Sequence, residues 1–528
     1  MQLQIPALFG DSMVLQRERP LTLTGRGEPG QPVTVTYATS TSTTTVAPDG
    51  TWTAALGPLE AHSEPGTLTI TSGTERIDLH DVVVGDVWLM AGQSNMELWL
   101  SRTKHAYPEA LEATDPLLRQ VAVPQTVALA GPLTPLEQAP MTWQTFSPAT
   151  APDFSAVGYS FARTLRERYG VPVGIIATGV GGTPISSWLP RADLERLGID
   201  LAPADALADP AAAAGLQARE QADGAAHQTT LDATDAGLAE GWASPSYDDT
   251  TWDHAPLTDP VPGSGATWFR TTLHVPAAER GKPATIFLGT ATDMDQVYVD
   301  GEQVGVTYYQ FPPRSYDLTL PDAETITIAL RLLTFGGSGG WTPFRNRFLA
   351  TDTHTWDLTG PWKRRTGTTT PDAPPTTFLR NLPGALFNGM TAPLTGTALT
   401  GVCWYQGEAD TSHPDGYAHR LTALIGTWRS LFGDDRLPVL IQQLPHWDPS
   451  SGRSPDPDHL ARWEALRDEQ RAVLTLPRTG LAAGYDVGEF NDLHPQDKRT
   501  VGERLARLAT RVAYGERRAP NMHELYHL

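Results

Sequence analysis

The feature that most constrains this chain is the apolar run DVVVGDVWLM at residues 81–90, which leads directly into GQSNMELWL. A continuous run of this kind is typical of a strand buried on both faces, and such strands occur in parallel sheets covered by helices. The run ends at Ser94, just before a predicted helix. Ser94 is therefore either the N-cap of that helix or a nucleophile at the carboxyl end of a sheet strand.

The rest of the chain alternates between two kinds of sequence pattern. Strand–loop–helix patterns, such as the helix SFARTLRERYG and the strand VPVGIIAT at 160–178, recur after about residue 380 and indicate a parallel α/β sheet. Period-2 strands with Gly and Pro turns fill the first 80 residues and residues 241–365. We therefore predict one α/β domain that is split in sequence. The predicted parts are an N-terminal β domain (1–81), the first half of the α/β core (82–195), a helical connector (196–240), an inserted β-sandwich (241–375) and the second half of the core (376–528).

Composition excludes several classes of partner. The chain has 60 acidic and 39 basic residues among 528, a formal charge of −21, which argues against nucleic acid or an anionic membrane surface. The single cysteine, Cys403, permits no intrachain disulfide, and its place in an apolar strand indicates a packing role. Neither a signal peptide nor a membrane-spanning run is recognisable, so we expect a cytoplasmic protein. The sequence does not indicate an oligomeric state.

Polar residues follow each predicted buried strand, where parallel sheets build their sites. They are Ser94, the loop VGGT (180–183), QGE (406–408) and NDLHP (491–495). Separately, each has an ordinary interpretation as a helix cap, a tight turn, a polar loop or a surface histidine. Together they supply a hydroxyl, backbone amides, a side-chain amide and an imidazole, which are the groups that acyl transfer requires.

Two other hydrolase types fit less well. The G-x-S-x-G turn of α/β-hydrolases needs a small residue two positions after the serine, where this chain has Met96. A metal site would need His, Asp and Glu in close register, as in HExxH, and the sequence contains no such motif. We therefore expect neither a metal nor another cofactor.

Four motifs together resemble the sialate O-acetylesterase family of SGNH hydrolases, and the resemblance extends over almost the whole chain. The motifs are GQSNM (92–96), GGTPISSW (181–188), WYQGEAD (404–410) and DLHP (492–495). The resemblance implies an α/β SGNH-hydrolase core, a parallel sheet flanked by helices. It also implies an N-terminal β-sandwich domain and an inserted jelly-roll β-sandwich similar to galactose-binding modules.

The resemblance also implies catalytic roles. Ser94 would be the nucleophile and His494 the general base that takes its proton and returns it to the departing sugar oxygen. The oxyanion hole would consist of the Ser94 amide, the amide of Gly182 or alternatively Gly181, and the side-chain amide of Gln406. The acyl-enzyme would then be hydrolysed to release acetate.

The residue that orients His494 is left open by the sequence. The SGNH superfamily has an aspartate three residues before the histidine, where this chain has Asn491. Asp492 is preferred because residues two apart in an extended loop point the same way; Asp486 and a backbone carbonyl are alternatives. Supporting roles are expected for the residues that flank the site, namely Gln93, Asn95 and Glu408.

Four aromatic residues near the motifs either stack on a sugar or belong to the core: Trp99, Trp188, Trp404 and Tyr405. The substrate is expected to be an O-acetylated sugar, and the leading hypothesis is a serine esterase that removes O-acetyl groups from sialic acids. A sialic acid would need a partner for its carboxylate, for which Arg102 and Arg314 are candidates. The alternatives are an esterase for acetyl xylan or another acetylated glycan, and an inactive carbohydrate-binding protein.

Overall fold

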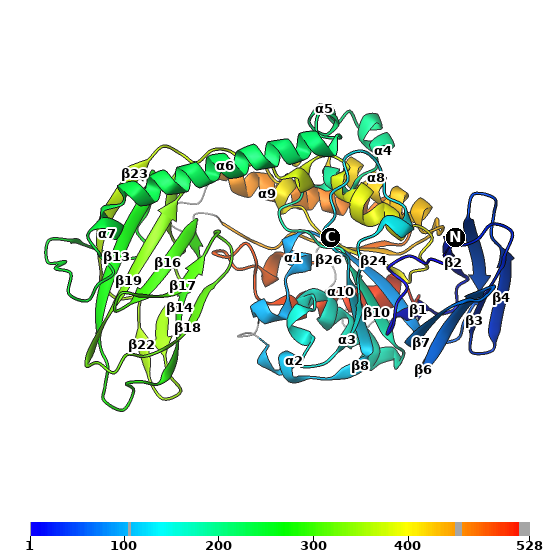
Figure 1. Ribbon diagram of the computed structural model, residues 1–528, viewed down its shortest axis with the longest axis horizontal. Helices are drawn as coiled ribbons and strands as arrows, with labels where there is room; N and C mark the ends of the chain where they lie inside the picture. The colour runs from blue at the N-terminus through cyan, green and yellow to red at the C-terminus, as the bar shows by residue number, and fades with distance from the viewer. Residues whose placement is uncertain (1, 104–106, 449–456, 517–528) are drawn as a thin grey trace. The chain divides into compact units, whose positions relative to one another are not determined.

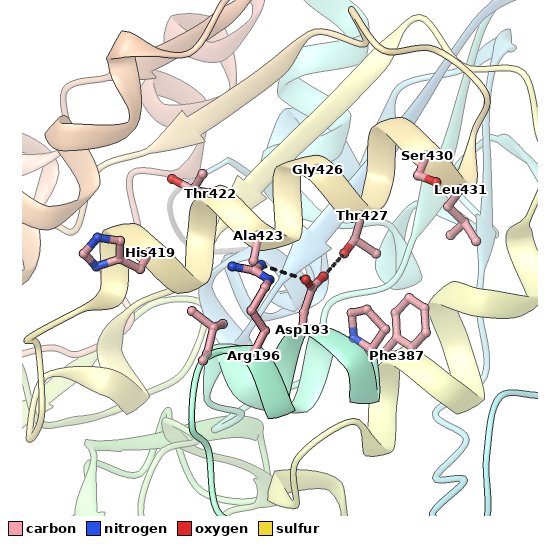
Figure 2. A pocket seen from close by; sticks show the side chains of 12 residues that line it. Asp193, Arg196, Phe387, His419, Thr422, Ala423, Gly426, Thr427, Ser430 and Leu431 are labelled. Atoms are coloured by element: carbon pink, nitrogen blue, oxygen red, sulfur yellow. Dashed lines mark hydrogen bonds and ion pairs between the residues drawn. The ribbon is translucent and has the colours of Figure 1, made fainter.

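The computed structural model describes residues 2–103, 107–448 and 457–516. The chain divides into two compact units. The first contains residues 1–213 and 378–528, and the second, inserted between them in sequence, contains residues 214–377. Figure 1 shows the strand and helix content of each unit.

The first unit is built on a seven-stranded sheet in the order β26-β25-β24-β7-β10-β8-β9. All neighbouring strands are parallel except β8 and β9. The strands are β7 (Glu75–Gly92), β8 (Asp115–Ala122), β9 (Trp143–Phe146), β10 (Val173–Ala177), β24 (Gly401–Tyr405), β25 (Val439–Gln442) and β26 (Thr479–Ala482). The central strands β7, β10 and β24 consist of buried residues where they pair, as their continuous apolar sequences predict.

Strand β7 also joins this sheet to the N-terminal strands. Its first half pairs with β6 and β1, and its second half pairs with β10 and β24. The N-terminal strands are β1 (Val14–Gln16), β2 (Leu21–Arg26), β3 (Pro32–Tyr37), β4 (Ser40–Thr45), β5 (Thr51–Leu56) and β6 (His62–Ser72). The boundary expected between residues 81 and 82 therefore falls within a continuous strand, because one extended segment serves both sheets.

Helices cover both faces of the parallel sheet. In Figure 1, α3 and α10 lie on one face, and α8 and α9 lie on the other. The helices of this unit are α1 (Ser94–Glu97), α2 (Pro108–Glu112), α3 (Ala156–Tyr169), α4 (Arg191–Arg196), α5 (Ala202–Asp205), α8 (Tyr417–Leu431), α9 (Pro457–Ala472) and α10 (Lys498–Val512). Local signals set several ends: Ser155 caps α3, Gly170 ends it in the left-handed conformation, and Asp497 caps α10.

The inserted unit contains two antiparallel sheets that share one hydrophobic core. Their strand orders are β11-β23-β13-β19-β16-β17 and β18-β14-β21-β22, with a small third sheet, β12-β20-β15. Buried residues such as Phe269, Ile286 and Leu330 fill the space between the sheets. The strands are β11 (Asp253–Ala255), β12 (Val261–Pro262), β13 (Ser264–His274), β14 (Pro283–Gly289), β15 (Ala291–Thr292), β16 (Met294–Val299), β17 (Glu302–Thr307), β18 (Arg314–Thr319), β19 (Thr325–Thr334), β20 (Ser338–Trp341), β21 (Phe348–Ala350), β22 (Thr355–Asp357) and β23 (Trp362–Thr370).

The expected helical connector is not a separate part. The long helix α6 (Pro210–Thr234) begins in the first unit and continues into the second, where α7 (Ala236–Ala239) follows it. Arg331 of β19 forms ion pairs with Asp232 of α6 and with Asp235, the N-cap of α7. The inserted unit therefore begins near residue 214, earlier than the residue 241 expected from the sequence, because these ion pairs fix the helical segment to the sandwich.

No helix within the described ranges is both long enough and apolar enough to span a membrane.

Candidate active site

The structure brings together two side chains that are 400 positions apart in the sequence. Nε2 of His494 lies 2.9 Å from Oγ of Ser94. Ser94 is the first residue of α1, whose N-cap is Gln93, so the interpretation of Ser94 as the helix cap is wrong. A hydroxyl in hydrogen-bond contact with an imidazole is the arrangement from which a serine nucleophile is activated.

Gly92 explains why the chain turns at this point. Its φ of +145° lies in a region that side chains rarely adopt, and a Cβ there would come within 2.1 Å of the Tyr405 carbonyl oxygen. The Gln93 N–H then donates to that same carbonyl at 3.0 Å. The end of β7 thus lies directly against the end of β24, and Ser94 is held at the carboxyl edge of the sheet.

His494 is in a state suited to accept a proton. Burial, together with the positive charges of Lys498 and Arg102, lowers the pKa of its imidazole to about 3. The ring is therefore neutral at neutral pH, which leaves one ring nitrogen as a hydrogen-bond acceptor. Nε2 can act as that acceptor toward the Ser94 hydroxyl.

Two of the expected oxyanion donors have available N–H groups. Within the described part of the chain, the amides of Ser94 and Gly182 donate to no other residue. Gly182 has φ +73° and open space around its Cβ position. In contrast, the Gly181 N–H donates to the Glu97 carboxylate at 2.7 Å, which removes it as a donor in this arrangement.

Gln406 does not occupy the expected oxyanion position. It is fully buried, and its Nε2 donates to the Thr183 carbonyl at 3.0 Å and to the Asp410 carboxylate at 2.6 Å. Its Oε1 accepts from the Tyr417 hydroxyl at 2.8 Å. A side-chain amide has only two N–H donors, so the prediction that Gln406 donates to an oxyanion is wrong for this geometry. Gln406 instead fixes the loop that carries Gly182.

The expected supporting residues connect the nucleophile to the segment after β24. The Gln93 Oε1 accepts from the Ala409 amide at 3.2 Å. The Asn95 Nδ2 donates to Glu408 Oε1 at 2.5 Å and to the Leu493 carbonyl at 3.0 Å. Both neighbours of Ser94 thus face inward, so that the chain presents only the serine at the site.

The two candidate aspartates are oriented differently. Asp492 Oδ1 accepts the backbone N–H of His494 at 2.8 Å, which shapes the turn before the histidine. Both carboxylate oxygens of Asp486 accept from the Arg504 guanidinium, at 2.6 and 2.7 Å, which directs Asp486 toward α10. Asp492 remains the predicted residue for orienting the imidazole, and the Arg504 contact argues against Asp486.

The aromatic residues near the motifs separate into core and surface. Trp188, Trp404 and Tyr405 have at most 1% of their surface exposed. A ring with no exposed face cannot stack on a sugar, so the expectation of substrate contact is wrong for these three. Trp99 is 47% exposed and remains a candidate. Arg314 is also excluded as a site residue, since it is buried in the inserted unit and paired with Asp295 at 2.5 Å.

Sequence reasoning missed several residues near the site. Glu97 is held by the Gly181 amide, and burial raises the pKa of its carboxyl. Lys498 is fully buried four residues after His494. Glu97 is part of the same GQSNME block as Ser94, but its partner is 84 positions away in sequence and no local pattern reveals it. Among the described residues, no group of three or more His, Cys, Asp or Glu could hold a metal ion.

A Ser–His pair and open backbone amides at the carboxyl edge of a parallel sheet are the groups that a serine hydrolase uses. Residues 84–199 and 384–511 match the model of the family described as carbohydrate esterase, sialic acid-specific acetylesterase. The match of these two segments confirms the resemblance to this carbohydrate-esterase family that was inferred from the four motifs.

Two curated relatives and one solved structure are also similar to this chain. The chain is 30% identical over 210 residues to mouse sialate O-acetylesterase and 34% identical over 209 residues to the rat protein. Each alignment covers 35% of this chain and 37% of the relative's length, so the chain spans little more than a third of the relatives it matches. The solved structure of a carbohydrate acetylesterase from Xanthomonas citri has a TM-score of 0.59 at 24% identity, covering 97% of this chain and 76% of that one, and thus shares the fold.

Proposed function

We propose that this protein is a serine carbohydrate esterase that removes O-acetyl groups from sialic acids through an acyl-serine intermediate. The observation that carries the proposal is the 2.9 Å contact between Ser94 Oγ and Nε2 of a buried His494. The match of both halves of the catalytic unit to the sialic acid-specific acetylesterase family supports the substrate class.

In this mechanism, His494 takes the Ser94 proton as Oγ attacks the acetyl carbonyl carbon. The negative charge that develops on the carbonyl oxygen is stabilised by the Ser94 and Gly182 amides. The imidazolium then donates the proton to the departing sugar oxygen. Water, deprotonated by the same imidazole, attacks the acetyl-serine and releases acetate with Ser94 restored.

Two features near the site suit an acidic sugar. Burial raises the pKa of the Glu97 carboxyl and lowers that of His494, and the positive charge of Arg102 acts on both groups, so the guanidinium lies within electrostatic range of the Ser–His pair. Arg102 has no ion pair or side-chain hydrogen bond with any described residue, which leaves its donors for a carboxylate. We therefore assign Arg102 to the sialate carboxylate.

The exposed aromatic residues of the first unit lie on the segments that form the site. Trp99 follows α1, Tyr485 and Phe490 precede His494, and Phe378 lies two residues before Arg380, whose charge also acts on Glu97. Their exposed fractions lie between 40% and 56%. Exposed rings of this kind can stack on the apolar faces of sugars, which supports a carbohydrate substrate.

The test compares acetate release from 9-O-acetyl-N-acetylneuraminic acid and from acetylated xylo-oligosaccharides. We expect the wild-type protein to prefer the sialate and Ser94→Ala to release no acetate from either. Arg102→Gln should raise KM for the sialate while leaving hydrolysis of p-nitrophenyl acetate, a neutral ester, unchanged. Equal slow release by wild type and Ser94→Ala would contradict the esterase proposal. A preference for the xylo-oligosaccharide would contradict only the substrate assignment.

A further inference from the structure

Lys498 is the first residue of α10 and is fully buried beside the catalytic pair. Its Nζ donates to Asn95 Oδ1 at 2.6 Å and lies 5.7 Å from the centre of the Tyr405 ring. A buried ammonium group is costly unless it is paired, and a cation at the positive end of a helix is unfavourable as well. A lysine in this place needs a reason beyond the stability of α10.

The contacts of Asn95 show what the lysine does. An ammonium group has donors only, so its partner on Asn95 must be the amide oxygen. The Nδ2 group is thereby directed to the opposite side, where it donates to Glu408 Oε1 and to the Leu493 carbonyl. Asn95 directly follows Ser94, and Leu493 directly precedes His494. One side-chain amide therefore connects the segment of the nucleophile to that of the base, and Lys498 determines its orientation.

Lys498 also contributes a positive charge. It is faced by Asp492 and Glu489 from the loop before α10, by Glu408 from the segment after β24 and by the helix cap Asp497. Burial nevertheless lowers the pKa of the ammonium group to about 8. The charge acts in turn on His494, which it disfavours in the protonated form together with Arg102.

We propose that Lys498 is a positioning residue of the active site: it orients the Asn95 amide, and through it holds the His494 segment against Ser94. This inference rests on the proposed function, since it assumes that His494 is the base. Lys498 does not contact the reacting atoms. Its effect is exerted through Asn95 and through the electric field at the imidazole.

The test compares Lys498→Met and Lys498→Arg in the full-length protein, with p-nitrophenyl acetate as the probe. We expect Lys498→Met to lower kcat about 100-fold with little change in KM, because a small displacement of a base has effects of that size. The acid limb of kcat/KM should move up by about one pH unit, since the loss of a nearby cation raises the pKa of His494. Lys498→Arg should restore most of kcat and remove any alkaline limb near pH 8, because arginine remains charged there.

Controls separate this role from a structural one. Arg499→Met removes the neighbouring cation, which pairs with Glu109 on the surface, and should leave kcat and the pH profile unchanged. If Lys498→Met does not fold, the double variant Lys498→Met/Glu408→Gln removes both buried charges and should show the same acid-limb shift. Folded variants with wild-type kcat and pH profile would overturn the inference. In that case Ser94→Ala must still be inactive for the proposed function to stand; full activity in Ser94→Ala would instead overturn the proposed function.

Discussion

Gln406 offers a sharp test because its sequence motif and its structural environment predict different consequences for the same substitution. As an oxyanion donor, its loss would lower kcat about 10²–10³-fold and leave the fold intact. In the structure, both of its N–H donors are used by Thr183 and Asp410. We therefore expect the main effect of Gln406→Leu to be on stability.

The expected loss of stability follows from the hydrogen bonds that the substitution removes. Gln406→Leu removes the donor to the Thr183 carbonyl and one of two donors to the Asp410 carboxylate, which retains the Ile185 amide at 2.9 Å. Leaving the buried Thr183 carbonyl unsatisfied costs about 1–3 kcal/mol, and losing one hydrogen bond to a charged group costs about 1.5–3 kcal/mol, so the substitution should lower the free energy of unfolding by about 3 kcal/mol. The Tyr417 hydroxyl keeps its bond to the Gln406 backbone carbonyl and adds little.

The assay is urea unfolding followed by tryptophan fluorescence, combined with kcat for p-nitrophenyl acetate on the folded protein. Tyr417→Phe is the matched control, since it removes the partner of Oε1 but leaves both N–H donors in place. We expect a shift of about 1 kcal/mol for this control. A Gln406→Leu protein with wild-type stability and a 10²–10³-fold lower kcat would refute the reasoning and return Gln406 to the oxyanion hole.

Three further predictions concern the base, the aromatic residues and the end of β7. Because the pKa of His494 is lowered to about 3, the neutral imidazole should persist through mildly acidic pH, so kcat/KM should stay constant from pH 7 to about 4.5 and fall only as His494 becomes protonated below that. Trp188→Ala should lower the free energy of unfolding by about 3–5 kcal/mol in urea unfolding, because the ring is buried, whereas Trp99→Ala should leave stability unchanged and raise KM for the sugar substrate. Gly92→Ala should prevent accumulation of folded protein on expression, measured against wild type by circular dichroism, because its Cβ would clash with the Tyr405 carbonyl oxygen. A folded, active Gly92→Ala protein would contradict this account of how Ser94 is placed.

Glu97 affects which glycine amide is available as an oxyanion donor. Its carboxylate accepts the Gly181 amide, while burial and the nearby Arg102 and Arg380 act on the pKa of its carboxyl in opposite directions. The contact fixes the glycine loop against α1 and leaves the Gly182 amide as the donor from that loop. The division between Gly181 and Gly182, which the sequence left open, therefore depends on a carboxylate in a different segment.

The sequence by itself determined the parts of the protein that depend on local pattern. The apolar run before Ser94 predicts a buried parallel strand, and Gly170 marks the end of α3. The motifs at strand ends predict that Ser94 and His494 meet, because the carboxyl ends of parallel strands lie at one edge of a sheet. The carbohydrate-esterase family is indicated by the resemblance of the four motifs. These signals require only neighbouring residues and the period of a strand or helix.

Tertiary structure alone decided which polar atoms are available for chemistry. Gln406 and Gly181 lie at the site, yet Asp410, Thr183 and Glu97 use their N–H groups. In the sequence, Lys498 has the pattern of an ordinary helix residue, and it becomes buried only because the start of α10 lies against Asn95 and the Tyr405 ring. Hydrogen-bond partners are set by contacts between segments hundreds of residues apart, and no local pattern specifies them.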